Sequence, residues 1–250
     1  MNRKQFILSI LSIPFFSQSL KAIGKSSFLE IGILKYSGNY NFRNSGLKKM
    51  LWEVSKRTSI EVSFDIIDID LKNKKKLFKH PLLFLTGDKK FSLSKTEIKN
   101  LKNYLTFGGL LFIDSASDEA SGTFNKSIEN LIESLYPKKK LKIAPKDHVI
   151  YRTFNLLDKP YGRLNISSNF YIIEEDNRIE ILYSKNDIIG ALTVDDFSNW
   201  KYSVPEGNKT REMAYRTGVN IIMYATCLAY KADQVHVDYL LKNRRWIVKY

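Results

Sequence analysis

Two short apolar runs, residues 82–85 and 110–113, flank a helix whose start and end are both well marked. Ser94 and Glu97 have the capping-box spacing, in which each side chain bonds the other residue's backbone amide. Gly108 follows the expected helix, and glycine readily adopts the left-handed backbone that ends helices. Because both runs are apolar throughout, they predict strands buried on both faces. The unit therefore predicts a strand–helix–strand crossover in a parallel sheet.

The same alternation of strand and helix patterns continues on both sides of this unit. Apolar residues predict strands over 29–34 and 60–66, a helix over 45–54 with Ser45 as N-cap, and a helix over 128–135. This rhythm is typical of an α/β fold, with a mostly parallel sheet and helices on both faces.

The pattern loosens between residues 140 and 210. Residues 170–173 and 179–183 alternate around Asp176-Asn177, which predicts a short hairpin. A long helix is expected from near Arg211, with several small residues on its apolar face. The hairpin and this C-terminal helix complete the predicted fold.

The N-terminal 24 residues have the composition of a signal peptide. Arg3 and Lys4 precede an apolar stretch over residues 6–16, and small residues suited to cleavage follow it. The stretch is shorter than a standard membrane span. We therefore expect residues 1–24 to be a signal peptide and residues 25–250 to form a single domain.

The leader also bears on the export route. Residues 2–7 are similar to a twin-arginine translocation signal in which Lys4 replaces the second arginine, so the general secretory route stays open. We expect an exported, periplasmic protein. The alternative is an uncleaved signal that anchors the chain to the inner membrane.

The net charge of +14 favours an anionic partner, and lysine supplies most of it. Lysine is a more solvated and less directional cation than arginine, and no nucleic-acid-binding motif is present, so we expect no nucleic-acid partner. An unidentified envelope protein, an anionic ligand or peripheral contact with a membrane surface fits better. The single cysteine and three scattered histidines predict no disulfide, no metal site from residue spacing and no cofactor.

Several segments, in order, resemble the domain of unknown function 4159 family. The matching stretches are residues 83–87, 108–114, 147–151, 211–214, 218–220 and 230–236, and the resemblance covers roughly residues 28–246. It implies a flavodoxin-like fold, similar to class I glutamine amidotransferase-like domains. Members often carry secretion signals or membrane segments. No established activity comes with the resemblance.

In those amidotransferases a nucleophilic cysteine occupies a tight turn after a strand. The corresponding residues here, 114–117, include no cysteine and lack the G-x-S-x-G pattern of a serine nucleophile. The resemblance therefore does not predict amidotransferase chemistry for this chain.

Ligands bind open parallel sheets beyond the carboxyl ends of the strands, which makes Gly87, Asp88, Asp114 and Ser115 candidate site residues. Asp114, Ser115 and His148 could form a hydrolase triad. Asp88, Asp114 and His148 could alternatively bind a divalent metal. For Asp114, capping of the next turn is the competing interpretation.

Two further residues are candidates for ligand binding. Arg211 lies near the start of the long helix, where an anion would be favoured, and a salt bridge is the alternative. Tyr151 follows His148 closely and could instead be part of a packed structural pair. Because no catalytic set is complete, we expect a non-catalytic binding or interaction domain of the cell envelope. The alternative is a hydrolase, amidase- or esterase-like or metal-assisted, acting at the strand carboxyl ends.

Overall fold

The computed structural model describes the backbone of residues 28–243 and the side chains as far as residue 226. The predicted signal peptide, residues 1–24, lies outside the described residues. The strands are β1 (Leu29–Leu34), β2 (Val62–Ile69), β3 (Leu82–Gly87), β4 (Leu110–Ser115), β5 (Lys142–Ile143), β6 (Tyr171–Glu175) and β7 (Arg178–Ser184). The helices are α2 (Asn44–Arg57), α3 (Lys74–Leu77), α4 (Lys95–Thr106), α5 (Thr123–Leu135), η1 (Val149–Tyr151), α6 (Ile188–Leu192) and α7 (Asn208–Asn243).

All seven strands form one sheet, in the order β2-β1-β3-β4-β7-β6-β5. The first five strands in this order are parallel to their neighbours, whereas β6 runs antiparallel to both β7 and β5. The five parallel strands have the spatial order of flavodoxin-like sheets. The predicted α/β, flavodoxin-like fold is confirmed, and so is the parallel arrangement of β1, β3 and β4.

The crossover between β3 and β4 forms as predicted. Ser94 and Glu97 make both bonds of a capping box at the start of α4, and Gly108 follows α4 with a φ of 106°. The two strands are in register from Leu82 opposite Leu110 to Gly87 opposite Ser115, and both are buried along their whole length. Their carboxyl ends therefore meet at one edge of the sheet.

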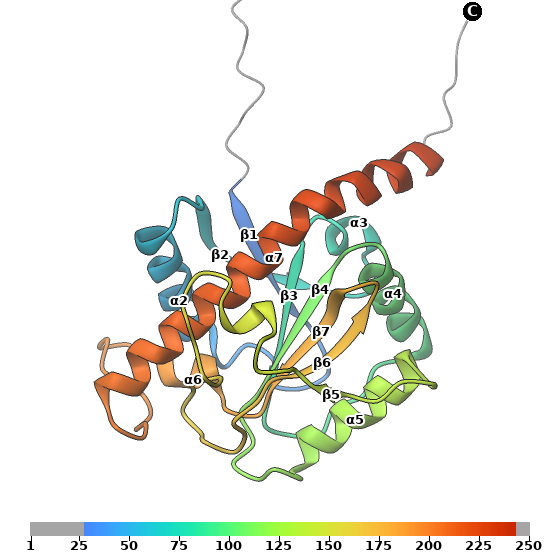
Figure 1. Ribbon diagram of the computed structural model, residues 1–250. Coiled ribbons are helices and arrows are strands. Elements are labelled where there is room, and N and C mark those ends of the chain that lie inside the picture. Colours follow the sequence, from blue (N-terminus) through green and yellow to red (C-terminus); the bar gives the residue numbers. More distant parts are fainter. Residues whose placement is uncertain (1–27, 244–250) are drawn as a thin grey trace, which may run out of the picture.

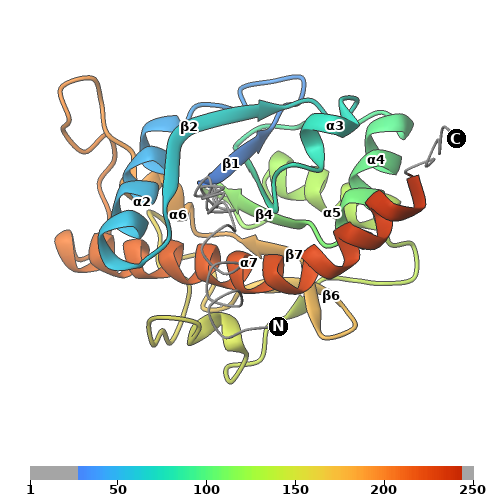
Figure 2. The same cartoon turned by 90° about the horizontal axis from the view of Figure 1, so that it is seen from above.

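Helices cover both faces of the sheet, as Figures 1 and 2 show. α2, α6 and α7 pack on one face together with η1, against the side chains of alternate strand residues such as Phe84 and Phe112. α3, α4 and α5 pack on the other face, against the intervening residues such as Leu85 and Ile113. Because side chains alternate along each strand, the residues of one strand contribute to two separate apolar layers, one on each face of the sheet.

Small residues allow the helices of the first layer to approach closely. A Cβ at Gly218 of α7 would lie 2.5 Å from the Met50 sulfur of α2, and one at Gly46 would lie 2.4 Å from the Ile189 carbonyl oxygen of α6. The long helix α7 therefore packs closely against α2 at Gly218.

The predicted hairpin is present, and it contributes more than expected. Asp176 and Asn177 adopt the positive φ values of 49° and 59° that suit a tight two-residue turn. β7 also pairs in parallel with β4, from Leu111 opposite Ile181 onwards. The hairpin therefore extends the main sheet and places the segment after β7 at its carboxyl edge.

Two local predictions differ from the structure. Ser45 is not the N-cap of α2, because the helix begins at Asn44 and the Ser45 hydroxyl donates to the Val194 carbonyl at 2.8 Å. The lysine-rich segment after β2 includes the one-turn helix α3, capped by the Asn73 side chain. Among the described helices, none is long and apolar enough to span a membrane.

The capping box predicts the effect of Ser94→Ala. The substitution removes the hydroxyl that accepts from the Glu97 amide, and it should lower the free energy of unfolding by about 1 kcal/mol. Chemical denaturation measures this loss. Ser59→Ala, at an exposed position after α2, is the matched control and should change stability much less. Equal effects of the two substitutions would contradict a stabilising role for the box.

Candidate functional site

Asp114, the penultimate residue of β4, is fully buried at the carboxyl edge of the sheet. Its Oδ1 accepts from the Ile188 amide at 2.9 Å, and its Oδ2 accepts from the Ile189 amide at 2.8 Å. These are the first two amides of α6, which lack partners within the helix. Asp114 therefore caps a helix, but that helix is α6 in a distant part of the chain, and not the turn after β4 that the sequence predicted.

Asp187 immediately precedes α6 and is also buried. Arg43 donates to it twice, from Nε at 3.1 Å and from Nη2 at 2.5 Å. Arg163 donates from Nε at 2.5 Å and reaches the Asp118 carboxylate, at 2.7 Å, with Nη2. Two arginines thus pair with the Asp187 carboxylate beside Asp114. We call Arg43, Asp114, Arg163 and Asp187 the edge cluster.

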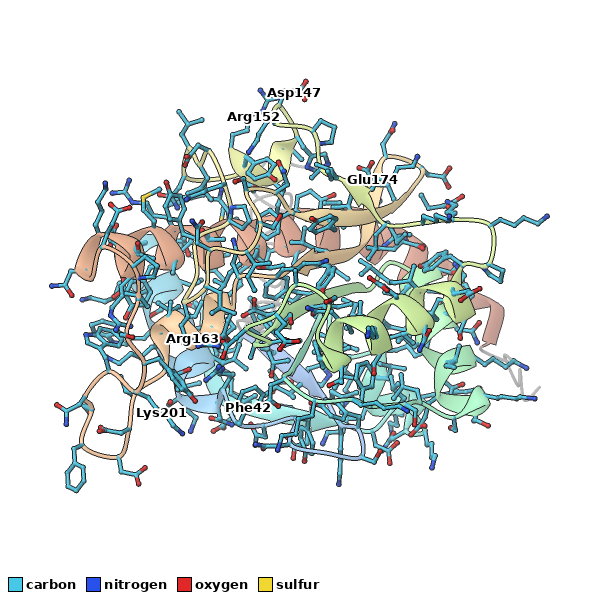
Figure 3. The ribbon with its side chains drawn as sticks, turned by 90° about the horizontal axis from the view of Figure 1, so that it is seen from below. Phe42, Asp147, Arg152, Arg163, Glu174 and Lys201 are labelled. Carbon is cyan, nitrogen blue, oxygen red and sulfur yellow. The ribbon has the colours of Figure 1, made fainter. Side chains whose placement is uncertain are left out.

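Aromatic rings enclose the arginines of the edge cluster. The guanidinium of Arg43 lies 4.5 Å from the centre of the Phe42 ring and 4.3 Å from that of Tyr202. Arg163 lies 5.3 Å from the same Tyr202 ring. Figure 3 shows Phe42, Arg163 and Lys201 on one side of the molecule. The rings keep solvent from Arg43, which is only 3% exposed.

Burial disturbs the ionisation of both acids in the edge cluster. Burial, together with the nearby charge of Asp187, raises the pKa of Asp114 to about 8, even though the amides of Ile188 and Ile189 and the charge of Arg43 act to lower it. Burial also raises the pKa of Asp187, against the lowering effect of Arg43 and Arg163. A raised carboxyl pKa is common in active sites and also in structural clusters.

Ser115 is fully buried, and its hydroxyl is bound within the fold. It donates to Asn125 Oδ1 at 2.6 Å, and the same oxygen accepts from the Tyr183 hydroxyl at 2.7 Å. Asn125 in turn donates to the carbonyls of Glu119 and Ala120. Ser115 therefore fixes the turn that leads from β4 to α5, and no base of the described residues forms a hydrogen bond with it.

His148 follows β5, the outermost strand beside β6, and it lies near the end of the sheet opposite the carboxyl edge. Its Nε2 donates to the Glu174 carboxylate at 3.1 Å, while its Nδ1 accepts from the Ile150 amide. Glu174 pairs with Ile179 near the start of β7, five residues before Ser184, which pairs with Asp114. Five strand residues span about 16 Å.

The structure therefore does not bring Ser115 and His148 together. Figure 3 shows Glu174, the partner of His148, well away from Arg163 of the edge cluster. The predicted Asp114–Ser115–His148 triad is not formed, because the histidine follows β5 at the opposite edge. The alternative metal site fails for the same reason, and the described residues include no group of three potential ligands that could hold a metal ion.

Gly87 and Asp88 have different environments, although they are adjacent. A Cβ at Gly87 would lie 2.1 Å from the Phe124 ring, so glycine is required for packing. Asp88 is exposed, and its charge adds to burial in raising the pKa of Tyr36, whose hydroxyl donates to the Thr86 carbonyl at 2.9 Å. Of the two, only Asp88 faces solvent, where it could meet a ligand.

Tyr151 and Arg211 also make internal contacts. The Tyr151 hydroxyl accepts from the Phe170 amide at 2.8 Å. Arg211 donates to the carbonyls of Ala191 and Tyr202, and burial lowers its pKa. Arg211 therefore holds the loop before α7, and it forms no salt bridge with the residues that the structure describes.

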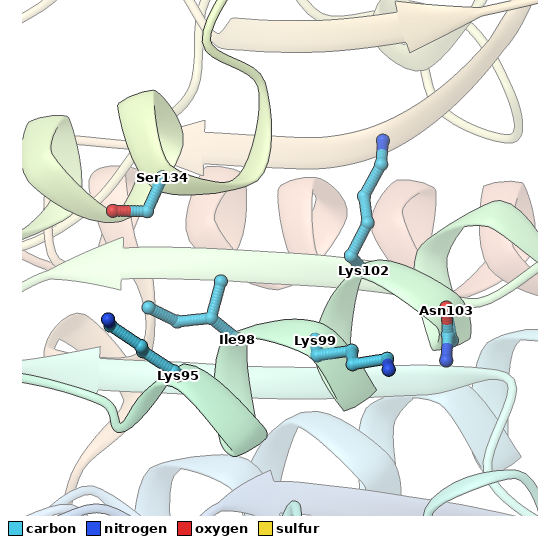
Figure 4. A pocket seen from close by; sticks show the side chains of 6 residues that line it. All are labelled: Lys95, Ile98, Lys99, Lys102, Asn103 and Ser134. Carbon is cyan, nitrogen blue, oxygen red and sulfur yellow. The ribbon is translucent and has the colours of Figure 1, made fainter.

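A shallow groove lies between α4 and α5, and none of its lining residues belongs to the edge cluster (Figure 4). Its lining is Lys95, Ile98, Lys99, Lys102, Asn103 and Ser134. These side chains include no carboxylate or histidine, so the groove offers no acid–base pair. Lys102 is also occupied, since it lies 3.5 Å from the centre of the Tyr136 ring and 3.7 Å from the Glu180 carboxylate.

The residues that sequence reasoning missed are Arg43, Arg163, Asp187 and Tyr202. Arginine is scarce in this lysine-rich chain, and it is the residue that suits buried ion pairs. Each arginine in the folded region is therefore a candidate for a buried ion pair. The pairing itself had no sequence signal, because Arg43 and Asp187 are 144 residues apart.

The pKa of Asp114 predicts how stability depends on pH. The folded protein keeps this proton at pH values where the unfolded chain has lost it, so stability falls as pH rises from 3.8 to about 8. An asparagine side chain cannot ionise, so Asp114→Asn should flatten this slope. Urea denaturation at a series of pH values measures the difference between the two proteins. Parallel curves would show that Asp114 does not titrate in this range.

Asp114→Asn should also be less stable at the acid end of this range, by about 1–3 kcal/mol. Both oxygens of a protonated carboxyl can still accept, whereas the amide nitrogen of asparagine would face a backbone donor. The equivalence of asparagine and aspartate that holds at ordinary helix caps therefore does not apply here.

Comparison with known proteins agrees with the fold. No curated protein matches the chain. The family model described as Domain of unknown function (DUF4159) matches residues 30–226, which include nearly all of the sheet and most of the helical segments described above. The chain therefore belongs to the DUF4159 family.

Proposed function

We propose that this chain is a non-catalytic binding domain of the cell envelope. The observation that carries the proposal is that the polar groups at the carboxyl edge are already bound within the fold. Asp114 uses both carboxylate oxygens on α6, Ser115 donates to Asn125, and Asp187 is held by two arginines. Catalysis by these groups would require breaking several buried hydrogen bonds before any substrate could be engaged.

A hydrolase remains the second candidate, supported by the raised pKa of Asp114. General-base catalysis also needs a base within hydrogen-bond reach of the nucleophile. Among the described residues, the Ser115 hydroxyl contacts Asn125, the Ser117 amide and the Tyr183 hydroxyl. None of these is a base, since burial raises the pKa of Tyr183. The contacts therefore favour the binding function.

Hydrolysis assays on the purified protein test the proposal. We expect ester and amide substrates to show no turnover above background, and Ser115→Ala to leave that result unchanged. His148→Ala is a matched control, because it alters a candidate residue at the other edge. Turnover that Ser115→Ala abolishes in a folded protein, and that His148→Ala leaves intact, would establish a hydrolase at the carboxyl edge.

The location in the envelope is part of the same proposal. The charged, apolar and small-residue regions of residues 1–24 support export. Fractionation with N-terminal sequencing should find a mature chain outside the cytoplasm that begins between residues 20 and 25. Arg3→Lys distinguishes the routes, because a twin-arginine substrate should be retained while a secretory substrate should still be exported. Unprocessed protein in the cytosol would contradict export.

A further inference from the structure

A braced hairpin, residues 194–202, presents an aromatic side chain to solvent. Val194 and Trp200 pair as an antiparallel bridge, and the Asp195 carboxylate accepts from the amides of Phe197 and Asn199 at 3.0 and 2.8 Å. Ser198 turns the chain with a φ of 66°. Phe197, at the tip, is 86% exposed. These local bonds hold the ring away from the apolar core.

The base of the hairpin is fixed to the body of the domain. Arg211 donates to the Tyr202 carbonyl at 2.6 Å, and its guanidinium lies 4.2 Å from the centre of the Trp200 ring. The Lys201 amide donates to the Thr193 carbonyl at 3.0 Å. In Figures 1 and 2 the orange segment before α7 projects from the body of the molecule. The fold therefore maintains a protruding aromatic tip.

The exposed surface of α2 continues this feature. Lys49 places its Nζ 4.8 Å from the centre of the Trp200 ring, and Trp52 follows Lys49 by three residues, on the same side of the helix. Trp52 is 49% exposed, and Lys56 lies 3.8 Å from the centre of its ring. Aromatic rings and lysines thus alternate from the hairpin along α2. We call this surface the aromatic–lysine patch: Lys49, Trp52, Lys56, Phe197, Trp200 and Lys201.

The acids near the patch leave it positive. Glu53 is paired with Arg57 at 2.5 Å. Asp195 and Asp196 are both exposed and oppose an anionic partner, although Asp195 also accepts from two backbone amides of the hairpin. The three lysines of the patch outweigh the two aspartates by one charge. The patch therefore combines exposed aromatic surface with net positive charge.

We infer that the aromatic–lysine patch binds the surface of an anionic phospholipid bilayer, with Phe197 and the two tryptophans at the level of the headgroups. Tryptophan suits that interface because its ring is both apolar and polar, and lysines can reach the phosphates from beside it. A projecting tip enters a bilayer interface readily, whereas a peptide or small ligand is usually bound in a groove. The inference rests on the proposed binding function and names its partner.

Sedimentation with lipid vesicles tests the inference on the processed protein. We expect binding to phosphatidylcholine vesicles that contain phosphatidylglycerol, little binding to phosphatidylcholine alone, and weaker binding at high salt. Phe197→Ser should reduce the binding constant about tenfold, by loss of the inserted ring. Lys56→Glu should reduce it more than about fivefold, since each surface cation contributes roughly a factor of five.

Two matched controls distinguish binding by the patch from non-specific binding of exposed apolar and basic side chains. Leu156→Ser removes an apolar side chain that is 83% exposed, on the segment that also carries Asp147 and Arg152. Figure 3 shows those two residues far from Lys201. Lys140→Glu reverses the charge at an exposed position after α5, as Lys56→Glu does on the patch. Both variants should bind vesicles nearly as the wild type does, and losses equal to those of Phe197→Ser and Lys56→Glu would overturn the inference.

Asp196→Asn offers a test in the opposite direction. Removal of one opposing charge should strengthen binding to the anionic vesicles about fivefold and leave binding to phosphatidylcholine unchanged. Wild-type protein that binds no vesicles, but captures an envelope protein through Phe197, would overturn the lipid inference and leave the binding function standing. Hydrolytic turnover would instead overturn the proposed function, whatever the vesicles show.

Discussion

The carboxyl edge of the sheet depends on one buried polar arrangement, in which Asp114 and Asp187 secure the start of α6 and two arginines offset the charge of Asp187. A buried carboxylate is costly unless it is paired and hydrogen-bonded. Here the pairing joins β4, the loop after β1, the loop before β6 and the segment after β7. The region that holds ligands in many open α/β sheets is thus closed by the protein's own side chains.

Because of this closure, the carboxyl edge does not offer the open crevice in which many α/β sheets bind ligands. Glycine at position 87, at the end of β3, admits the Phe124 ring and leaves no room there for a ligand. Three buried asparagines act in the same way on the loops: Asn125, Asn186 and Asn220 each bond several backbone groups of neighbouring segments. Backbone that would be free to wrap a substrate is therefore already fixed. Recognition at the outer surface, by helix and hairpin, is compatible with such a rigid interior.

Local signals allowed much of the fold to be predicted from the sequence, whereas the site could not be. Ser94, Glu97 and the apolar run 82–85 act within a few residues, so their pattern is visible in the chain. Helix α6 has only five residues, too few to show periodicity. The position of Ser115 at the end of a strand was predictable, but His148 lies in a segment with little regular structure. Nothing in its local sequence shows which edge of the sheet it reaches.

The ion pair between Arg43 and Asp187 also has a consequence for the order of folding. Its partners are 144 residues apart, and Asp187 follows the last strand to join the sheet. Contacts between distant residues form only after much chain entropy has been lost. The Asp187 carboxylate therefore becomes available to Arg43 only after nearly the whole domain has been made. The ion pair therefore favours complete chains. A chain that ends before β7 lacks Asp187, so it would either bury the Arg43 guanidinium without a counter-charge or leave α2 unpacked.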